Sequence, residues 1–375
     1  MPLQRCESEG APLLHSASKR RTHQTFDAEE EKKNMNNGSE RPNLFDYATS
    51  ELSQDAFLAW LLANASKHFA GTNVHRCGVR LLNLMAQRCR VERFDGTEAI
   101  TVRRQHKNMD IYARIKRRDG DADKDDVVLV IEDKAGAYVH GDQLERYKQT
   151  LVDEGASPEN AMLIYCQTYN QSQLSQIKSV GYEIVTRHDL LEILKDCDDE
   201  VVGEFLTHLK GIDELTNSWR TSSMYDNQDR DSWDWLAWQG FYMEIQRVFP
   251  DAEWAYVPNP SGGFLGLWWH WREIEGGNAY LQLEQTRACF KVEVTDVDHR
   301  QELKFDWNER ILNSASTLGM DSVVRPRVMR VGNYMTVAVL NNDYRSVKSD
   351  GLIDINETVH NLKQMECVLE NAIKN

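Results

Sequence analysis

An apolar run in the first half of the chain ends in three charged residues. Residues 127–131 are apolar and mostly β-branched, and Glu132, Asp133 and Lys134 follow directly. A run of this kind, bounded by polar sequence, predicts a buried strand. Because successive strand side chains point to opposite faces, Glu132 and Lys134 share one face and Asp133 points to the other. We therefore expect a carboxylate and an ammonium group side by side at the end of this strand.

A second carboxylate is expected to reach the same point. Residues 109–116 alternate between apolar and polar side chains, which predicts another strand with Asp110 near its start. The polar, Gly-containing link 119–126 suits a hairpin between the two strands. In an antiparallel hairpin, Asp110 lies opposite the end of the second strand. Asp110, Glu132 and Lys134 should therefore converge.

These three residues have the chemistry of a divalent-cation site beside a lysine. Asp110 and Glu132 are hard oxygen ligands of the kind that Mg²⁺ prefers, with water and phosphate filling the other positions. Lys134 can orient an attacking water or stabilise transition-state charge. A helix near residues 140–154 would place Gln143 and Tyr147, four residues apart, on one face. This set suits phosphodiester hydrolysis, which requires charge neutralisation and hydroxide near neutral pH.

The order Asp, hairpin, Glu-x-Lys, Gln-x-x-x-Tyr resembles the PD-(D/E)XK nuclease superfamily, and Gln143-x-x-x-Tyr147 looks like its RecB-type branch. The resemblance implies a metal-dependent nuclease with Mg²⁺ or Mn²⁺ as cofactor and DNA favoured over RNA as substrate. It also implies that the backbone carbonyl of Asp133 ligates metal, and that Gln143 and Tyr147 position the phosphate or a nearby base. Met109 stands where the family name has Pro, at a position that bears no chemistry. Repair, restriction and defence against phage are the contexts that such a resemblance suggests.

Glu51 is a further candidate from the same resemblance. An apolar stripe predicts a largely buried helix over residues 51–69, with Glu51 in its first turn. In the resembling family a Glu on the first helix approaches the metals, and Glu51 looks like that residue. The alternative is that Glu51 only interacts with the helix dipole.

Other functions remain open at this stage. Glu132 and Lys134 could be an exposed ion pair at a strand end, with Tyr147 in ordinary helix packing. The chain could also be a nuclease-fold protein that binds nucleic acid or a partner protein without cutting, and the presence of Asp110, Glu132 and Lys134 together argues against this. An RNase or a structure-specific nickase is a third reading.

Charge is unevenly distributed along the chain. Residues 67–118 hold thirteen Lys or Arg against four Asp or Glu, a net charge of +9, within a chain whose net charge is −15. An acidic protein should repel a polyanion, yet this basic block leads directly into the strand of Asp110. We therefore expect phosphate contacts from the basic residues nearest Asp110, which are Arg103, Arg104, Lys107 and Arg114.

The element pattern predicts two folded domains after a tail. Residues 1–41 are polar and lack periodicity, which predicts disorder. In domain 42–211 we expect an α/β fold, a restriction-endonuclease-like mixed sheet flanked by helices. Besides the elements named above, the pattern indicates strands over 99–103, 160–166 and 181–186, and helices over 74–90, 167–179, 188–195 and 200–210.

The remaining residues, 212–375, should form an accessory α+β domain. Nine of the ten Trp residues lie here, and they could form a packed core or stacking platforms for bases. The pattern indicates helices over 233–249, 301–318 and 357–374, and antiparallel strands over 254–257, 264–270, 279–284 and 289–294. Dimerisation, target selection and partner binding are all open for this half.

Composition excludes several classes. No apolar run approaches the length of a membrane span, so we expect no membrane partner. The seven cysteines are scattered without a CxxC pair, which favours free thiols in a reducing cytoplasm. Counted from Asp119, a calcium loop would need Gly at the sixth position and Glu at the twelfth, where this chain has Lys124 and Val130, so the acidic link is a solvated turn.

Overall fold

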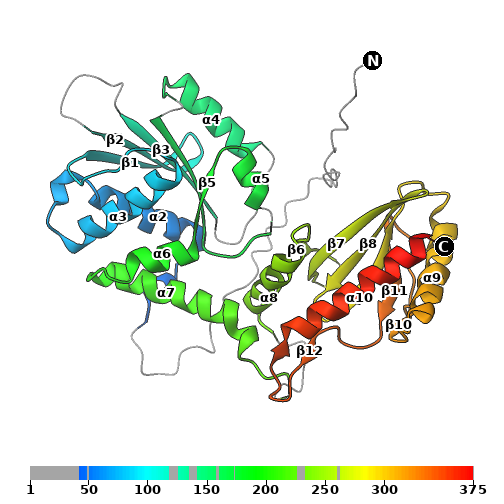
Figure 1. Ribbon diagram of the computed structural model, residues 1–375. Coiled ribbons are helices and arrows are strands. Elements are labelled where there is room, and N and C mark those ends of the chain that lie inside the picture. The colour runs from blue at the N-terminus through cyan, green and yellow to red at the C-terminus, as the bar shows by residue number, and fades with distance from the viewer. Residues whose placement is uncertain are drawn as a thin grey trace. The chain divides into compact units, whose positions relative to one another are not determined.

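The computed structural model describes residues 42–48, 50–117, 126–134, 142–157, 160–172, 174–225, 233–259 and 262–374. The predicted disordered tail, 1–41, and nearly all of the link 119–126 lie outside these residues. The described residues form two large sheets, each with helices and a main hydrophobic core, and one two-stranded hairpin (Figure 1).

The first sheet is mixed and has five strands in the order β1-β2-β3-β4-β5. β1 and β2 pair antiparallel, as do β2 and β3, whereas β3, β4 and β5 run parallel. The bounds are β1 Ala99–His106, β2 Met109–Lys116, β3 Val127–Lys134, β4 Ala161–Gln167 and β5 Glu183–Thr186. β3 is central and buried along its whole length, as its continuous apolar run predicts.

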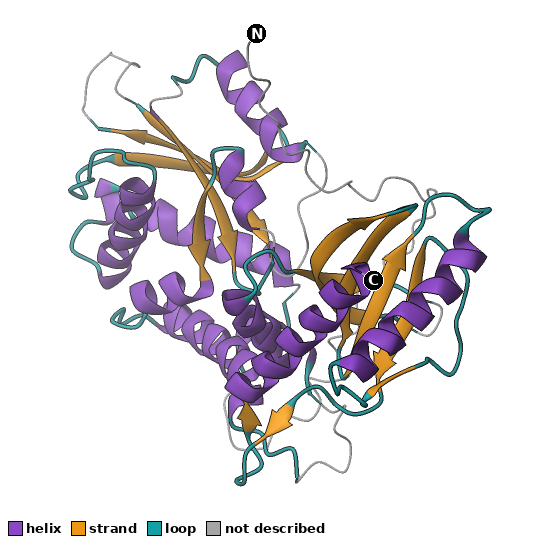
Figure 2. Ribbon diagram, turned by 45° about the vertical axis from the view of Figure 1, so that its right-hand side comes forward, coloured by secondary structure: helices purple, strands orange, loops and turns teal. Residues whose placement is uncertain are grey.

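Helices cover both faces of this sheet (Figure 2). One face carries Ile111, Leu129 and Ile131 and packs on four helices. These are α2 (Ser50–Asn64), α3 (Asn73–Arg88), α6 (Arg187–Leu194) and α7 (Glu200–Asn217). The other face packs on α4 (Gln143–Asp153) and α5 (Leu174–Ser179). The predicted mixed α/β sheet flanked by helices is confirmed.

Two local features bring the elements around β2 into position. α2 and α3 approach closely at Gly78, where an added Cβ would lie 2.5 Å from the carbonyl oxygen of Leu61. β1 and β2 are joined by the two residues Lys107 and Asn108, with φ of 50° and 70°. A two-residue hairpin turn of this hand matches the twist of the strands and needs positive φ at both positions.

Several predicted bounds were wrong. The helix predicted over 51–69 ends at Asn64, because the amide of Lys67 bonds to the carbonyl of Glu98 and the chain continues as a short 3-10 turn, Lys67–Phe69. The segment 167–179 is helical only in α5, and strand 99–103 continues to His106. α7 runs through Gly211 to Asn217. The domain division at residue 211 stays a prediction.

The second sheet is antiparallel, with six strands in the order β10-β11-β9-β8-β7-β6. The bounds are β6 Glu253–Val257, β7 Phe264–Ile274, β8 Gly277–Glu284, β9 Arg287–Glu293, β10 Val323–Val324 and β11 Tyr334–Leu340. The helices α8 (Trp235–Val248), α9 (Arg300–Thr317) and α10 (Ile355–Lys374) share one core with it. A small hairpin, β12 (Ser346–Val347) and β13 (Ile353–Asp354), precedes α10. The sequence did not predict β10 to β13.

Most of the tryptophans in this half form the core. The buried ones are Trp219, Trp233, Trp238, Trp254, Trp269 and Trp307. Trp271, at 38% exposure, stacks on Tyr280 with ring centroids 3.9 Å apart. All six cysteines in the described ranges are free thiols. Among the described residues, no helix combines the length and the apolar character needed to cross a bilayer.

Candidate active site

Asp110, Glu132 and Lys134 meet at one end of the β2–β3 pair. Ile111 lies opposite Ile131 in the ladder, so Asp110 and Glu132 face each other one position further along. Lys134 Nζ lies 2.6 Å from Glu132 Oε1 and 4.0 Å from Asp110 Oδ2. The register of an antiparallel pair thus brings together residues that are a hairpin apart in the sequence.

Burial makes this cluster electrostatically unusual. Glu132 is fully buried, and its Oε2 has no hydrogen-bond partner among the described residues. Burial, together with the charge of Asp110, raises the pKa of Glu132 to about 7, although the bond to Lys134 opposes the shift. Burial disfavours charge on Lys134, yet the bond to Glu132 and the nearby carboxylates raise the pKa of its ammonium group above the usual value. Lys134 therefore stays protonated at neutral pH.

Glu51 reaches the same lysine from the first turn of α2. Its Oε1 lies 3.2 Å from Lys134 Nζ, and its side chain is 42% exposed. Three carboxylates thus surround one ammonium group, and Glu51 is the one most open to solvent.

Gln143 and Tyr147 cover Glu132 from α4. Gln143 Nε2 lies 2.8 Å from Glu132 Oε1 and 2.6 Å from the hydroxyl oxygen of Tyr147. The Tyr147 hydroxyl donates to the backbone carbonyl of Asn108 in the β1–β2 turn, 2.5 Å away. Burial raises the pKa of Tyr147 to about 12, so the hydroxyl remains a donor. This chain of bonds fixes the orientation of the Glu132 carboxylate.

Asp133 serves the cluster from the opposite face. Its backbone amide donates to Asp110 Oδ2 at 3.0 Å, while its side chain, fully buried, lies with Gln54 and Asp55 of α2. Burial, and then the charge of Asp110, raises the pKa of Asp55 to about 6. Burial, and then the charge of Asp55, raises the pKa of Asp133 well above its usual value. Metal ligation by the carbonyl of Asp133 stays a prediction.

Sequence reasoning missed several residues of the site. Gln105 Nε2 donates to Asp110 Oδ1 at 3.3 Å, from a position with φ of 52°. Gln54 donates a hydrogen bond to Asp133, and the carbonyl of Asn108 accepts one from the Tyr147 hydroxyl. The hairpin turn at Lys107 and Asn108, had it been recognised, would have placed Gln105 opposite Asp110.

The four predicted phosphate contacts differ in availability. Arg103 is exposed, lies opposite Tyr112 in the ladder and makes no ion pair with the described residues. Arg104 bonds to the carbonyl of Leu52 and lies 3.9 Å from Asp55. Lys107 pairs with Glu154 and Arg114 with Asp126, both at 2.6 Å. The basic block is thus partly neutralised within the fold.

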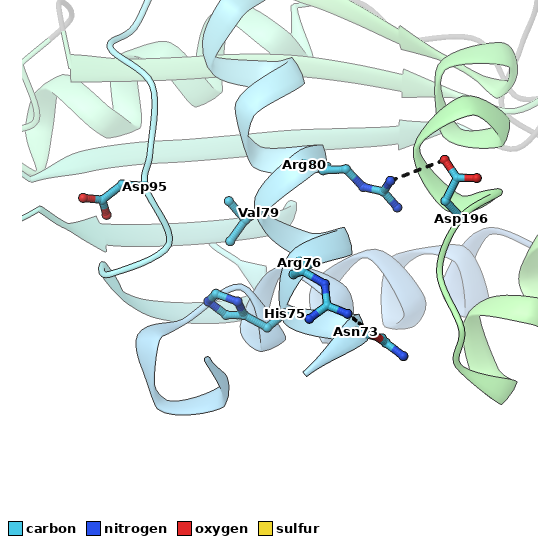
Figure 3. A pocket seen from close by; sticks show the side chains of 7 residues that line it. All are labelled: Asn73, His75, Arg76, Val79, Arg80, Asp95 and Asp196. Carbon is cyan, nitrogen blue, oxygen red and sulfur yellow. Dashed lines mark hydrogen bonds and ion pairs between the residues drawn. The ribbon is translucent and has the colours of Figure 1, made fainter. Parts of the chain in front are cut away.

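A separate pocket of about 350 Å³ lies on α3 (Figure 3). Its cations already have partners: Arg80 lies 3.6 Å from Asp196, and Arg76 bonds to Asn73. None of the predicted site residues lines it; its lining residues are Asn73, His75, Arg76, Val79, Arg80, Asp95 and Asp196. The pocket is a mixed-charge surface away from the Asp110 cluster.

A mixed sheet whose antiparallel pair carries Asp110 and Glu132-x-Lys134 at one end is a restriction-endonuclease-like core. Residues 42–210 match the family model of the PD-(D/E)XK nuclease superfamily. No curated protein and no solved structure matches the chain. The RecB-type assignment, which rests on Gln143 and Tyr147, stays a prediction.

Proposed function

We propose that the chain is a metal-dependent nuclease that hydrolyses phosphodiester bonds, with DNA as its substrate. The observation that carries this proposal is the meeting of Asp110, Glu132 and Glu51 around Lys134, within 4.0 Å of its Nζ. The match of residues 42–210 to the family model of the PD-(D/E)XK nuclease superfamily supports the same reading. DNA is preferred because the resembling branch mostly cuts DNA.

The donor set fits Mg²⁺ or Mn²⁺. Glu132 Oε2 is buried and has no hydrogen-bond donor among the residues that the structure describes, and a carboxylate oxygen in that state suits a cation. No cluster of three or more His, Cys, Asp or Glu side chains suited to a metal occurs within the described ranges. Magnesium is held by one or two carboxylates with water and phosphate, so Asp110 and Glu132, with Glu51 and the Asp133 carbonyl, would suffice. When bound, the cation supplies charge neutralisation and activates water.

The protein's own groups have distinct tasks in this proposal. Lys134, charged at neutral pH, donates to the attacking water or to the negative phosphoryl oxygens. Gln143 and Tyr147 hold Glu132 in place. In this proposal they also position the phosphate or the adjacent base. Arg103 supplies an exposed cation on the same face of the sheet as Asp110. A cytoplasmic role in repair, restriction or phage defence belongs to the same proposal.

Cleavage assays with matched variants test the proposal. The purified full chain is incubated with linear duplex DNA, single-stranded DNA, plasmid and RNA, each with Mg²⁺, Mn²⁺ or EDTA. Asp110→Asn and Lys134→Met are compared with Asp95→Asn, an exposed carboxylate, and Lys291→Met, a lysine that is also 9% exposed and lies 3.5 Å from Glu284. Calorimetry of Mn²⁺ binding supplies a readout that does not depend on activity.

The proposal predicts cleavage that requires metal, is lost in Asp110→Asn and Lys134→Met, and persists in both controls. Of the four variants, only Asp110→Asn should bind Mn²⁺ more weakly than the wild type. Cleavage that is equal in all variants would come from a contaminant and would refute the assignment. Nucleic-acid binding without cleavage by the wild type would favour the non-cutting alternative, and preferential cleavage of RNA would replace the DNA assignment.

A further inference from the structure

Asp133 supports the candidate active site in two directions at once. Its amide donates to Asp110 Oδ2 at 3.0 Å. Its side chain, on the opposite face of β3, is fully buried against α2. Whatever holds the side chain of Asp133 therefore also holds the amide that orients Asp110.

Gln54 holds this side chain by a hydrogen bond. The Nε2 of Gln54 donates to Asp133 Oδ1, and its Oε1 accepts from the hydroxyl of Thr168 at 2.8 Å. Gln54 is 4% exposed and Thr168 is fully buried. One amide thus ties α2 to the end of β3 and to the residue that follows β4.

Thr168 is itself a fixed anchor. Its amide bonds to the carbonyl of Lys134 at 3.4 Å, and its carbonyl accepts from Arg187 Nη1 at 2.5 Å. Through Thr168, Gln54 is attached to the parallel pair β3–β4 and to the start of α6. The hydrogen bonds of Gln54 therefore link α2 to the sheet and, through Thr168, to α6.

Glu51 depends on the same attachment. It precedes Gln54 by three positions, so the two side chains lie on the same side of α2. Glu51 contacts Lys134 at 3.2 Å but is 42% exposed, and the bond from Arg104 to the Leu52 carbonyl is exposed as well, so these contacts restrain the helix end only weakly. The buried bonds of Gln54 supply that restraint.

We propose that Gln54 is a positioning residue, which locks the first turn of α2 to the ends of β3 and β4 so that Glu51 reaches Lys134 and the Asp133 amide holds Asp110. This inference rests on the proposed nuclease function. Gln54 touches none of the predicted reacting groups directly, and it acts through Asp133 and Glu51.

The test compares Gln54→Leu with Gln239→Leu, which removes a similarly buried amide, 6% exposed against 4%, from α8. Gln54→Leu should lower turnover by roughly ten- to hundredfold at nearly unchanged KM, as small misplacements in active sites do. Thr168→Val, which breaks one of the two bonds, should have a smaller effect. In a Glu51→Ala background, Gln54→Leu should lower turnover less than in the wild type, because both act on one contact.

Hydrogen exchange of the metal-free protein separates this inference from the nuclease assignment. Gln54→Leu should speed exchange in peptides covering α2 and the end of β3, and leave the second sheet unchanged. Equal losses of turnover in Gln54→Leu and Gln239→Leu, or independent effects of Gln54 and Glu51, would overturn the positioning role. If the wild type cleaves no substrate while exchange still changes locally, the nuclease proposal fails and the structural tie stands.

Discussion

Replacing Lys134 by Met removes a positive charge that lies among three carboxylates. Lys134 Nζ lies 2.6 Å from Glu132, 3.2 Å from Glu51 and 4.0 Å from Asp110. Methionine is unbranched and flexible, so it can follow the path of the lysine stem while losing the ammonium group. The substitution therefore tests charge with little change in packing.

We expect Lys134→Met to lower both the free energy of unfolding and the turnover. Removing one partner of a buried ion pair costs about 3–5 kcal/mol when the other charge remains. Glu132 keeps its bond from Gln143 at 2.8 Å, and with a pKa of about 7 it can take up a proton near neutral pH. We therefore expect a loss of unfolding free energy near the lower end, about 3 kcal/mol. Turnover should fall by about 10²–10³, as for loss of one donor to developing negative charge.

The assay pairs steady-state turnover in Mg²⁺ with urea unfolding at pH 7 in EDTA. Lys291→Met is the control, since this lysine has the same exposed fraction, 9%, and its own carboxylate and hydroxyl partners. It should lose stability while each folded molecule keeps wild-type turnover. Wild-type turnover in Lys134→Met would refute the reasoning. A loss of turnover no greater than that in Lys291→Met would refute it as well.

Three further predictions concern binding and stability. Arg103→Gln should raise KM for nucleic acid with little change in kcat, because Arg103 is exposed and has no ion-pair partner among the described residues; unchanged KM would contradict its phosphate contact. The bond from Lys107 lowers the pKa of Glu154, and burial opposes this shift without cancelling it. Glu154 therefore stabilises the fold above its unfolded pKa, near 4.5, and this stabilisation is lost as pH falls through the lower folded pKa. Glu154→Gln should thus cost up to about 1 kcal/mol at pH 7, a surface-pair value, and nothing at strongly acidic pH in urea titrations; a pH-independent difference would count against the pair. Gly78→Ala should cost about 1–3 kcal/mol, because the new Cβ meets the carbonyl of Leu61, and an unchanged melting temperature would contradict this.

The local pattern was sufficient for the central strands. Residues 109–116 and 127–134 form β2 and β3 with the predicted bounds, because one alternates cleanly and the other is a continuous apolar run. The antiparallel register then follows from the hairpin, and it brings Asp110 to Glu132. This much of the site was therefore accessible from the chain alone.

Contacts that depend on tertiary packing were not accessible in this way. The β1–β2 turn uses Lys107 and Asn108 without a glycine, so it carries no strong hairpin signal, and Gln105 was not placed beside Asp110. Gln54 looks like any polar residue on an amphipathic helix until α2 is packed on Asp133. The strand β11 was missed in the second half.

The internal pairing of the basic block has a consequence for how a polyanion would associate with this protein. Lys107 and Arg114 already hold Glu154 and Asp126, so a phosphate that engages either cation must displace a carboxylate anchored in the same fold. Each such exchange releases fewer condensed counterions than contact with a free lysine would. The affinity for a polyanion should therefore fall less steeply with ionic strength than the number of basic residues implies. Non-specific complexes with nucleic acid should dissociate quickly.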